Sequence, residues 1–272
     1  MNRLMQWVMA AALICSSTVF TSCSNDDNSV DPTKNLSEKI IGKWIIADKN
    51  GQAAPTNEKT VATFLSATKA KVSTSRSDYT GSATKWSAYQ EYDVNINGDK
   101  LTLTRQVNES VTLVNEYVIK SITNTEIFCD FRHVTIHDGQ PDYRDWQALR
   151  LVKLNVDYKE AVLGLWECTG LSGGETYNDD NDRLEFFEDG TYKYWRKNDA
   201  GEWKEVTTRE FQNYFADGTL LATRWKNIEE DELREWWEIV TIKGDKMQWK
   251  ALRQNEDGST FEQTMDWERV VE

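Results

Sequence analysis

Few residues of this sequence have the types and spacing that chemistry requires. Its two histidines, His133 and His137, would lie about 13 Å apart on one face of a strand, too far to share a metal ion. Residues 177–182 are rich in carboxylates and amides, but they lack the Gly and Glu that a calcium loop needs at its sixth and twelfth positions. No nucleophile elbow, phosphate-binding loop or dinucleotide fingerprint occurs. The sequence therefore favours a protein that is not an enzyme and that binds neither a metal ion nor a cofactor.

Tryptophan is the residue type with the strongest binding potential. The chain has 12 Trp among 272 residues. Indole rings stack on sugar rings and also pack against apolar molecules or other proteins. Trp236 and Trp237 are adjacent, so on a strand they would face opposite sides of the sheet. Both are therefore candidate surface aromatic residues, and the alternative is that indoles fill the interior of the fold.

The composition is that of a folded, acidic protein. Apolar residues make up 39% and aromatic residues 11%, enough for a large core, and the formal net charge is −13. This charge argues against nucleic acid as a partner. It is unevenly spread, because residues 156–272 hold 28 Asp and Glu against 15 Lys and Arg, whereas residues 36–155 hold 14 against 15. The second half should repel anions and attract cations or a basic protein surface.

The N-terminus has the pattern of an export signal. Residues 1–22 contain one charged side chain, Arg3, and an apolar run too short to span a membrane, as in a signal peptide. Residues 20–23, Phe-Thr-Ser-Cys, resemble the lipobox of bacterial lipoproteins, in which the cysteine thiol is alkylated with diacylglycerol. The resemblance implies lipidation at Cys23 and anchoring to the outer membrane, with residues 23–35 as a flexible tether.

An acidic run follows this cysteine. Residues 24–28, Ser-Asn-Asp-Asp-Asn, resemble the surface-export signal of some Gram-negative lipoproteins. A plain polar spacer would have the same composition and would leave the protein facing the periplasm. We expect surface display, with the periplasmic position as the alternative.

The chain repeats itself with a shift of about 120 residues. Residues 41–44, Ile-Gly-Lys-Trp, return as Leu-Gly-Leu-Trp at 163–166, and Arg-Leu-Val at 150–152 matches Arg-Val-Val at 269–271. Within each copy, apolar residues alternate with polar ones and Asn-Gly or Asp-Gly pairs separate the runs, which predicts short antiparallel strands. We therefore expect two all-β domains, residues 36–154 and 158–272, each an up-and-down barrel of about eight strands.

These copies resemble the lipocalin-like domains of bacterial lipoproteins. The resemblance rests on the Gly-x-Trp motif of the first strand, the Phe-x-x-Asp-Gly-Thr-Tyr hairpin at residues 186–192 and an arginine on the last strand. It implies that the tryptophan plugs the barrel floor and that the late arginine packs across it. The corresponding barrel-floor residues are Trp44 with Arg150 and Trp166 with Arg269.

Aligned positions predict which barrel is roomier. Ala70, Val72 and Cys129 of the first copy stand where the second has Tyr192, Tyr194 and Trp249. We therefore expect the larger cavity in the first barrel. Its predicted apolar lining is Phe64, Ala70, Val72, Tyr117, Ile119 and Cys129.

Cys129 and Cys168 align with apolar residues of the other copy, Trp249 and Ile46. Buried free thiols are therefore expected rather than a disulfide.

Two functional hypotheses follow. The first is a lipid-anchored outer-membrane lipoprotein that binds a small apolar molecule or a glycan without catalysing a reaction. The alternative is a structural or protein-interaction module with filled barrels that acts through its acidic, tryptophan-rich second domain.

Overall fold

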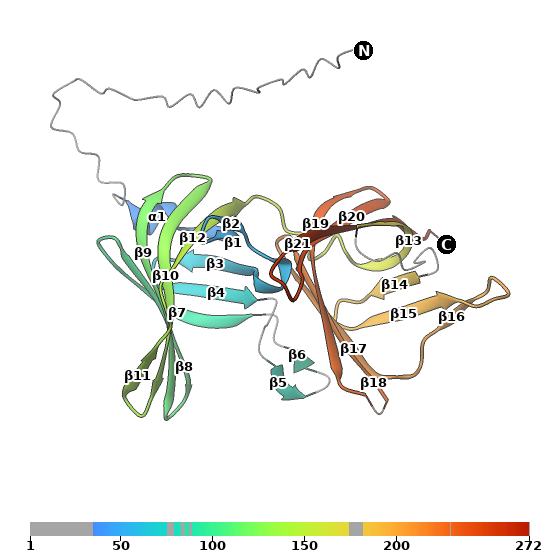
Figure 1. The fold of residues 1–272 in the computed structure, drawn as a ribbon, viewed down its shortest axis with the longest axis horizontal. Coiled ribbons are helices and arrows are strands. Elements are labelled where there is room, and N and C mark those ends of the chain that lie inside the picture. The colour runs from blue at the N-terminus through green and yellow to red at the C-terminus, as the bar shows by residue number, and fades with distance from the viewer. Residues whose placement is uncertain are drawn as a thin grey trace, which may run out of the picture. The chain divides into compact units, whose positions relative to one another are not determined.

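The computed structural model describes residues 35–74, 79–82, 85–86, 89–173, 182–228 and 230–271 (Figure 1). The predicted signal peptide, the lipidation site Cys23, the acidic run and most of the calcium-like segment lie outside the described residues. Residues 32–272 form one compact unit. No helix in the described part of the chain is long and apolar enough to cross a membrane.

The fold is all-β and antiparallel, as predicted. The first sheet is a closed barrel of eight strands in which β1 (Gly42–Lys49) pairs with β3 (Thr60–Ser66) on one side and with β12 (Gln147–Leu154) on the other. Each barrel strand pairs with the barrel strand that follows it in the sequence, which is the up-and-down order. The remaining barrel strands are β4 (Lys69–Thr74), β7 (Gln90–Asn97), β8 (Lys100–Asn108), β9 (Val111–Ile122) and β10 (Glu126–His137).

Short elements flank this barrel. They are the helix α1 (Leu36–Lys39), the 3-10 turn η1 (Thr56–Glu58), β2 (Gln52–Ala53), β11 (Gln140–Tyr143) and the separate β5–β6 hairpin (Tyr79–Ser82, Lys85–Trp86).

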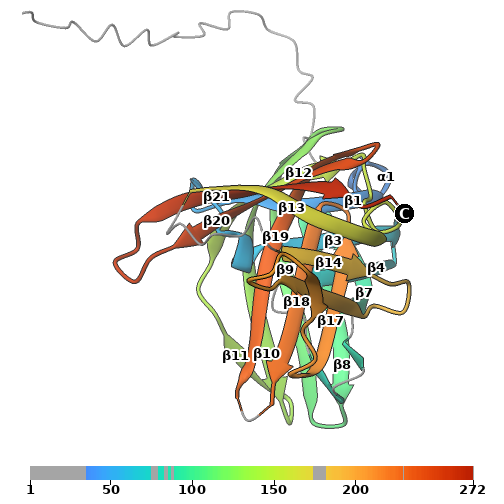
Figure 2. The same cartoon turned by 90° about the vertical axis from the view of Figure 1, so that its right-hand side faces the viewer.

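The second sheet curls without full closure. Its nine strands run in the order β16-β15-β14-β13-β21-β20-β19-β18-β17, and β17, β18 and β19 lie side by side in Figure 2. Strand β15 pairs with β16. Thr191, directly before β15, forms a single bridge with Asn213 of β17. The strands are β13 (Gly164–Ser172), β14 (Asp182–Phe186), β15 (Tyr192–Lys197), β16 (Trp203–Glu205), β17 (Arg209–Asp217), β18 (Leu220–Asn227), β19 (Glu232–Lys243), β20 (Lys246–Gln254) and β21 (Thr260–Arg269).

Each sheet encloses its own hydrophobic core. One core surrounds Trp44 and the other surrounds Trp166 and Trp249. A third, smaller cluster joins Ile45 and Val61 of the first sheet to residues of the second, namely Phe215, Leu220 and Ala222.

Polar contacts reinforce this junction between the sheets. Lys43 forms ion pairs with Asp157 at 2.7 Å and with Asp217, and Lys59 Nζ lies 2.8 Å from Glu238 Oε2. The β17–β18 turn also contacts the first sheet. A Cβ atom on Gly218 (φ 62°) would lie 2.4 Å from Leu154 Cδ1, so glycine fits here without moving that side chain and adopts this φ without strain. The two sheets are thus held together by apolar packing and by partly exposed ion pairs.

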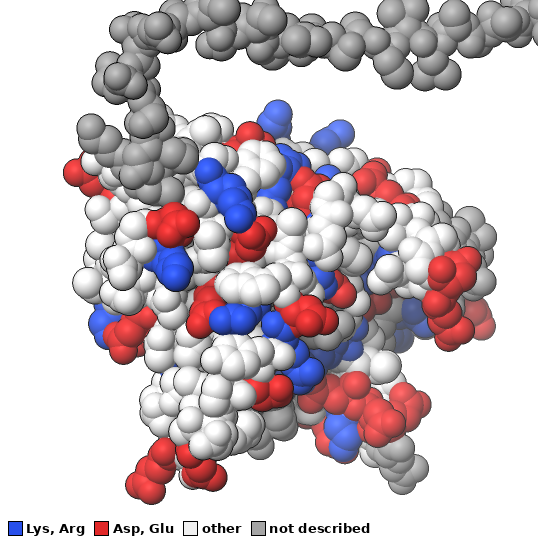
Figure 3. Space-filling model, turned by 60° about the vertical axis from the view of Figure 1, so that its left-hand side comes forward, with Lys and Arg blue, Asp and Glu red and all other residues white. Residues whose placement is uncertain are grey.

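Surface charge on the side shown in Figure 3 is mixed. Acidic and basic side chains are interspersed there, without a large patch of one sign.

Candidate ligand-binding site

Two tryptophans occupy equivalent positions in the two sheets. Trp44 and Trp166 are both 0% exposed. Each indole Nε1 donates a hydrogen bond of 2.7 Å to the carbonyl four residues earlier, that of Ile40 or Val162. A buried indole with its donor satisfied is a structural element. Trp44 and Trp166 are therefore equivalent structural residues of the two cores, and their place at a barrel floor stays a prediction.

The cation that lies over each of these indoles is set by strand register. Arg269 stands opposite Trp166 and lies 4.1 Å from the ring centroid, and it also donates to the carbonyls of Leu163 and Ala161. Lys153 stands opposite Trp44 and lies 5.1 Å from its ring. The prediction that Arg150 packs across Trp44 is therefore wrong.

Arg150 lies three residues from that position. It pairs instead with Asp48 and, at 2.7 Å, with Glu126. The glycine of the Gly-x-Trp motif has a positive φ in both copies, 123° at Gly42 and 103° at Gly164, and a Cβ there would lie 2.8 Å from Lys153 Cε or 2.7 Å from Arg269 Nη1.

The first barrel is more filled than expected at the predicted lining residues. Phe64, Ala70, Ile119 and Cys129 are buried in its packed core. A cavity of about 540 Å³ lies in this barrel, and of the six predicted residues it is lined by Val72 and Tyr117. Burial raises the pKa of the Tyr117 hydroxyl and raises the pKa of the Cys129 thiol to about 12. In the described part of the chain, Cys129 and Cys168 form no disulfide and are both buried, as predicted.

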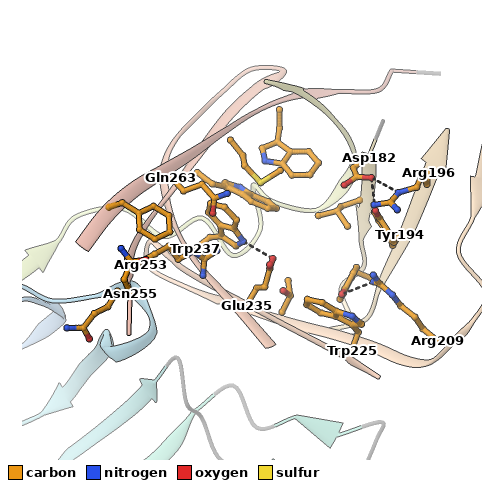
Figure 4. Close-up of a pocket in the computed structure, with 18 residues that line it drawn as sticks. Asp182, Tyr194, Arg196, Arg209, Trp225, Glu235, Trp237, Arg253, Asn255 and Gln263 are labelled. Atoms are coloured by element: carbon orange, nitrogen blue, oxygen red, sulfur yellow. Dashed lines mark hydrogen bonds and ion pairs between the residues drawn. The ribbon is translucent and has the colours of Figure 1, made fainter. Parts of the chain in front are cut away.

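A larger cavity, of about 800 Å³, lies in the second sheet (Figure 4). The prediction that the first barrel has the larger cavity is therefore wrong. The large aromatic side chains of the second sheet are buried in its core and also border this cavity, which lies where the wall is open between β15 and β17. The lining comprises Asp182, Leu184, Tyr192, Tyr194, Arg196, Arg209, Thr223, Trp225, Glu235, Trp237, Trp249, Arg253, Gln254, Asn255, Phe261, Gln263, Met265 and Trp267.

Indole rings form a continuous wall of this cavity. The ring centroids of Trp249 and Trp267 are 4.5 Å apart, and those of Trp237 and Trp249 are 5.8 Å apart. Trp237 is 3% exposed and faces this interior, whereas Trp236 faces the other side and packs half-buried against the junction cluster. The two neighbours thus point in opposite directions, as predicted, but neither is an exposed platform. Aromatic walls of this kind can hold a flat or ring-shaped molecule.

Charged groups lie on both sides of the cavity. Figure 4 shows Arg253 and Asn255 on one side and Asp182 and Arg196 across from them. Asp182 accepts a hydrogen bond of 2.6 Å from the Tyr194 hydroxyl and pairs with Arg196 at 3.3 Å. Burial raises the pKa of the Tyr194 hydroxyl further above neutral pH.

Arg209 and Arg253 are held by aromatic rings. Arg209 lies 4.5 Å from the ring of Tyr194 and 5.0 Å from that of Trp225, and its Nη1 donates to the Tyr192 hydroxyl at 3.3 Å. The Arg253 guanidinium lies 4.6 Å from the Trp237 ring, and burial lowers its pKa.

Three buried donors of the lining have no partner among the described residues: the Nε1 atoms of Trp249 and Trp267 and the Nε atom of Arg209. Leaving a buried donor unpaired is unfavourable. Each of these three atoms is itself covered, so a ligand in the cavity reaches one of them only if the neighbouring side chains shift.

Arg209, Glu235 and Arg253 were not predicted from the sequence, although it contains a signal for Arg253. Met247, Trp249 and Ala251 alternate along β20 as inward residues of the core, and Arg253 continues the same series. A charged residue at an inward position of an apolar alternation indicates a polar interior site.

The described residues contain no group of three His, Cys, Asp or Glu side chains that could hold a metal ion.

Comparisons with known proteins define no family for this chain. No family model and no curated protein matches it. Among solved structures it is similar to a protein of unknown function of the DUF3598 family from Nostoc punctiforme PCC 73102, with 9% identity, 85% of this chain and 97% of the other covered, and a TM-score of 0.25. It is also similar to a double mutant of transferrin binding protein B from Haemophilus parasuis Hp5. The identity is 8%, the match covers 85% of this chain and 45% of the other, and the TM-score is 0.24.

A third solved structure is a candidate outer membrane protein from Bacteroides fragilis NCTC 9343, with 10% identity, 87% and 100% coverage, and a TM-score of 0.22. The match to the transferrin binding protein covers less than half of that protein's length. TM-scores this low carry no argument about function.

Proposed function

We propose that this protein is a lipid-anchored lipoprotein of the outer membrane, displayed at the cell surface, that binds a small ring-bearing molecule or a glycan branch in its second sheet. The observation that carries the proposal is the cavity of about 800 Å³ with its indole wall and its hydrogen-bonding side chains. Ligand pockets commonly have this size and this mixture of aromatic surface with a few polar groups. The proposal moves the site from the first barrel to the second sheet.

Binding is favoured over catalysis by the chemistry of the lining. Its carboxylates, Asp182 and Glu235, each accept a hydrogen bond from an aromatic side chain, Tyr194 and Trp237 respectively. Among the residues that the structure describes, the lining contains no histidine, cysteine or serine that could serve as a nucleophile or its base. The cavity also counts against the alternative of a scaffold protein with filled barrels.

The membrane anchor is supported by the sequence pattern around Cys23. Growth of the producing cells with a labelled fatty acid should label the wild-type chain and leave Cys23→Ser unlabelled. Protease added to intact cells should digest the wild-type protein if it is displayed at the surface. Labelling of the variant would contradict the anchor, and full protection from protease would favour the periplasmic position.

Ligand binding can be tested by calorimetric titration of the chain from residue 24 with a panel of neutral sugars, oligosaccharides and apolar ring compounds. At least one member should bind saturably. Trp237→Leu should weaken that binding at least tenfold, because it removes part of the ring wall. Trp236→Leu is the matched control, since this neighbour faces away from the cavity, and it should bind as the wild type does. Absence of saturable binding across the panel would contradict the proposed function.

A further inference from the structure

The charge inside the cavity is opposite to that of the half of the chain that surrounds it. Residues 156–272 hold 28 acidic against 15 basic side chains, yet the lining holds three arginines and two carboxylates. Asp182 forms an ion pair with Arg196 at 3.3 Å. The other charged residues of the lining are Glu235, Arg209 and Arg253, so the lining has an excess of one positive charge.

Arg253 is the arginine of the lining whose charge is least compensated. Its guanidinium lies against the ring of Trp237, 4.6 Å from the centroid, and forms no ion pair with any described carboxylate. Burial disfavours its charged form, an effect that the charge of Glu235 offsets in part. A buried cation without a paired anion is unfavourable. A carboxylate supplied by a ligand would pair with it in a bidentate manner.

The unpaired hydrogen-bonding groups of the lining point to the same chemistry. The Nε1 atoms of Trp249 and Trp267 and the Nε atom of Arg209 are all donors, and all three are buried without a partner in the described structure. Because each of these atoms is covered by its neighbours, a ligand that displaces those neighbours must supply acceptors. An ionised carboxylate has only acceptor sites, about four of them, and no donor.

The apolar part of the lining favours a ring over an alkyl chain. Trp225, Trp237, Trp249, Trp267, Tyr192, Tyr194 and Phe261 contribute seven aromatic rings, whereas the aliphatic lining consists of Leu184 and Met265. Aromatic surfaces stack on flat rings and on the apolar faces of sugars. The amides of Gln254, Asn255 and Gln263 lie in the same lining as Arg253 and can bind further polar groups of such a ligand.

We propose that the second sheet selects a ring-bearing carboxylic acid, with Arg253 as the residue that binds the carboxylate and Arg209 as a second cationic contact. This rests on the proposed function and narrows its ligand class. Two kinds of molecule share the chemistry, an aromatic acid and a sugar acid. The acidic exterior slows the approach of such an anion, whereas the arginine-lined interior supplies the affinity.

The test compares acids with neutral counterparts of nearly the same shape. The chain from residue 24 is titrated by calorimetry at pH 7 with 2-naphthoate and 2-naphthamide, and with glucuronate and glucose. At least one acid should bind tenfold or more tightly than its neutral counterpart. The pair that shows this preference distinguishes the aromatic acid from the sugar acid.

Variants separate a specific carboxylate site from a general charge effect. Arg253→Gln should lower the affinity for the acid at least tenfold and leave the neutral counterpart within about twofold. Lys250→Gln is the matched control, because it removes a positive charge from the same strand at a position that does not line the cavity. It should leave both affinities unchanged. Circular dichroism and the thermal midpoint report whether each variant is folded, and Arg209→Gln provides a second variant with the same expected direction.

The outcomes distinguish failure of the carboxylate proposal from failure of the proposed function. Equal affinity for acid and neutral counterpart, or an Arg253→Gln variant that retains the preference, would overturn the carboxylate proposal and leave a binding protein. Absence of binding by all four compounds would also overturn it. The proposed function would then still be decided by the wider neutral panel.

Discussion

Two adjacent leucines of β18 provide a test of how the sheets are joined. Leu220 and Leu221 are both 0% exposed, but Leu220 belongs to the junction cluster with Val61 of the first sheet, whereas Leu221 belongs to the core of the second. Because successive side chains of a strand face opposite ways, the same Leu→Ala change one residue apart perturbs different contacts. The two substitutions are therefore matched in residue type, burial and strand.

The expected magnitudes follow from burial. Leu220→Ala and Leu221→Ala should each lower the free energy of unfolding by about 2–5 kcal/mol. The distinction lies in their coupling to Val61→Ala. Residues that share one cluster show interaction energies of about 0.5–3 kcal/mol, whereas separate sites add to within about 0.3–0.5 kcal/mol. Leu220→Ala should therefore couple to Val61→Ala, and Leu221→Ala should not.

The assay is urea unfolding of the chain from residue 24, followed by tryptophan emission, for the wild type, the three single variants and the two double variants that contain Val61→Ala. If both double variants are additive, the junction cluster does not join the sheets energetically. If Leu221→Ala couples to Val61→Ala as strongly as Leu220→Ala does, the separation into distinct cores is wrong.

Three further predictions use single sites. Cys129 and Cys168 should resist a thiol reagent at pH 8 until urea unfolds the chain, because both are buried and burial raises the pKa of Cys129 to about 12; rapid labelling of the native protein would contradict this. Burial lowers the pKa of His133, so its contribution to stability is present above pH 6.5 and is lost as the pH falls toward the folded pKa. The urea midpoint of His133→Asn should therefore fall less between pH 7.5 and 5.5 than that of the wild type, and an equal fall would argue against it. Arg269→Met removes the cation over Trp166 and two hydrogen bonds to carbonyls, so thermal unfolding should show a loss of about 2 kcal/mol; no loss would mean that the floor contact is not stabilising.

Much of the architecture could be predicted because it is encoded locally. The turns at Asn97-Gly98 and Asp217-Gly218 connect paired strands, and both glycines have positive φ, 61° and 62°. The alternation of inward and outward residues between such turns defines strands whatever the rest of the chain does. The fold class was therefore accessible from the sequence.

The cation over Trp44 was not accessible, because it depends on pairing between strands that are distant in the chain. Sequence matching aligned Arg150 with Arg269, but strand register places Lys153 opposite Trp44. A match between short motifs cannot resolve a shift of three residues when Arg and Lys provide the same charge. Register is set by the whole ladder from Lys43–Leu154 to Lys49–Leu149.

The second sheet is open between β15 and β17, whereas the first barrel is closed. This difference explains why a comparison of side-chain sizes alone predicted the larger cavity in the first barrel. Larger residues reduce an interior only when the same strands close around it. In the first barrel β4 pairs with β7 through four residues, from Lys69 to Val72. In the second sheet β15 pairs with β16, and one bridge replaces that ladder. Where this wall is open, the bulky residues at 192, 194 and 249 line the cavity together with the inward Arg253.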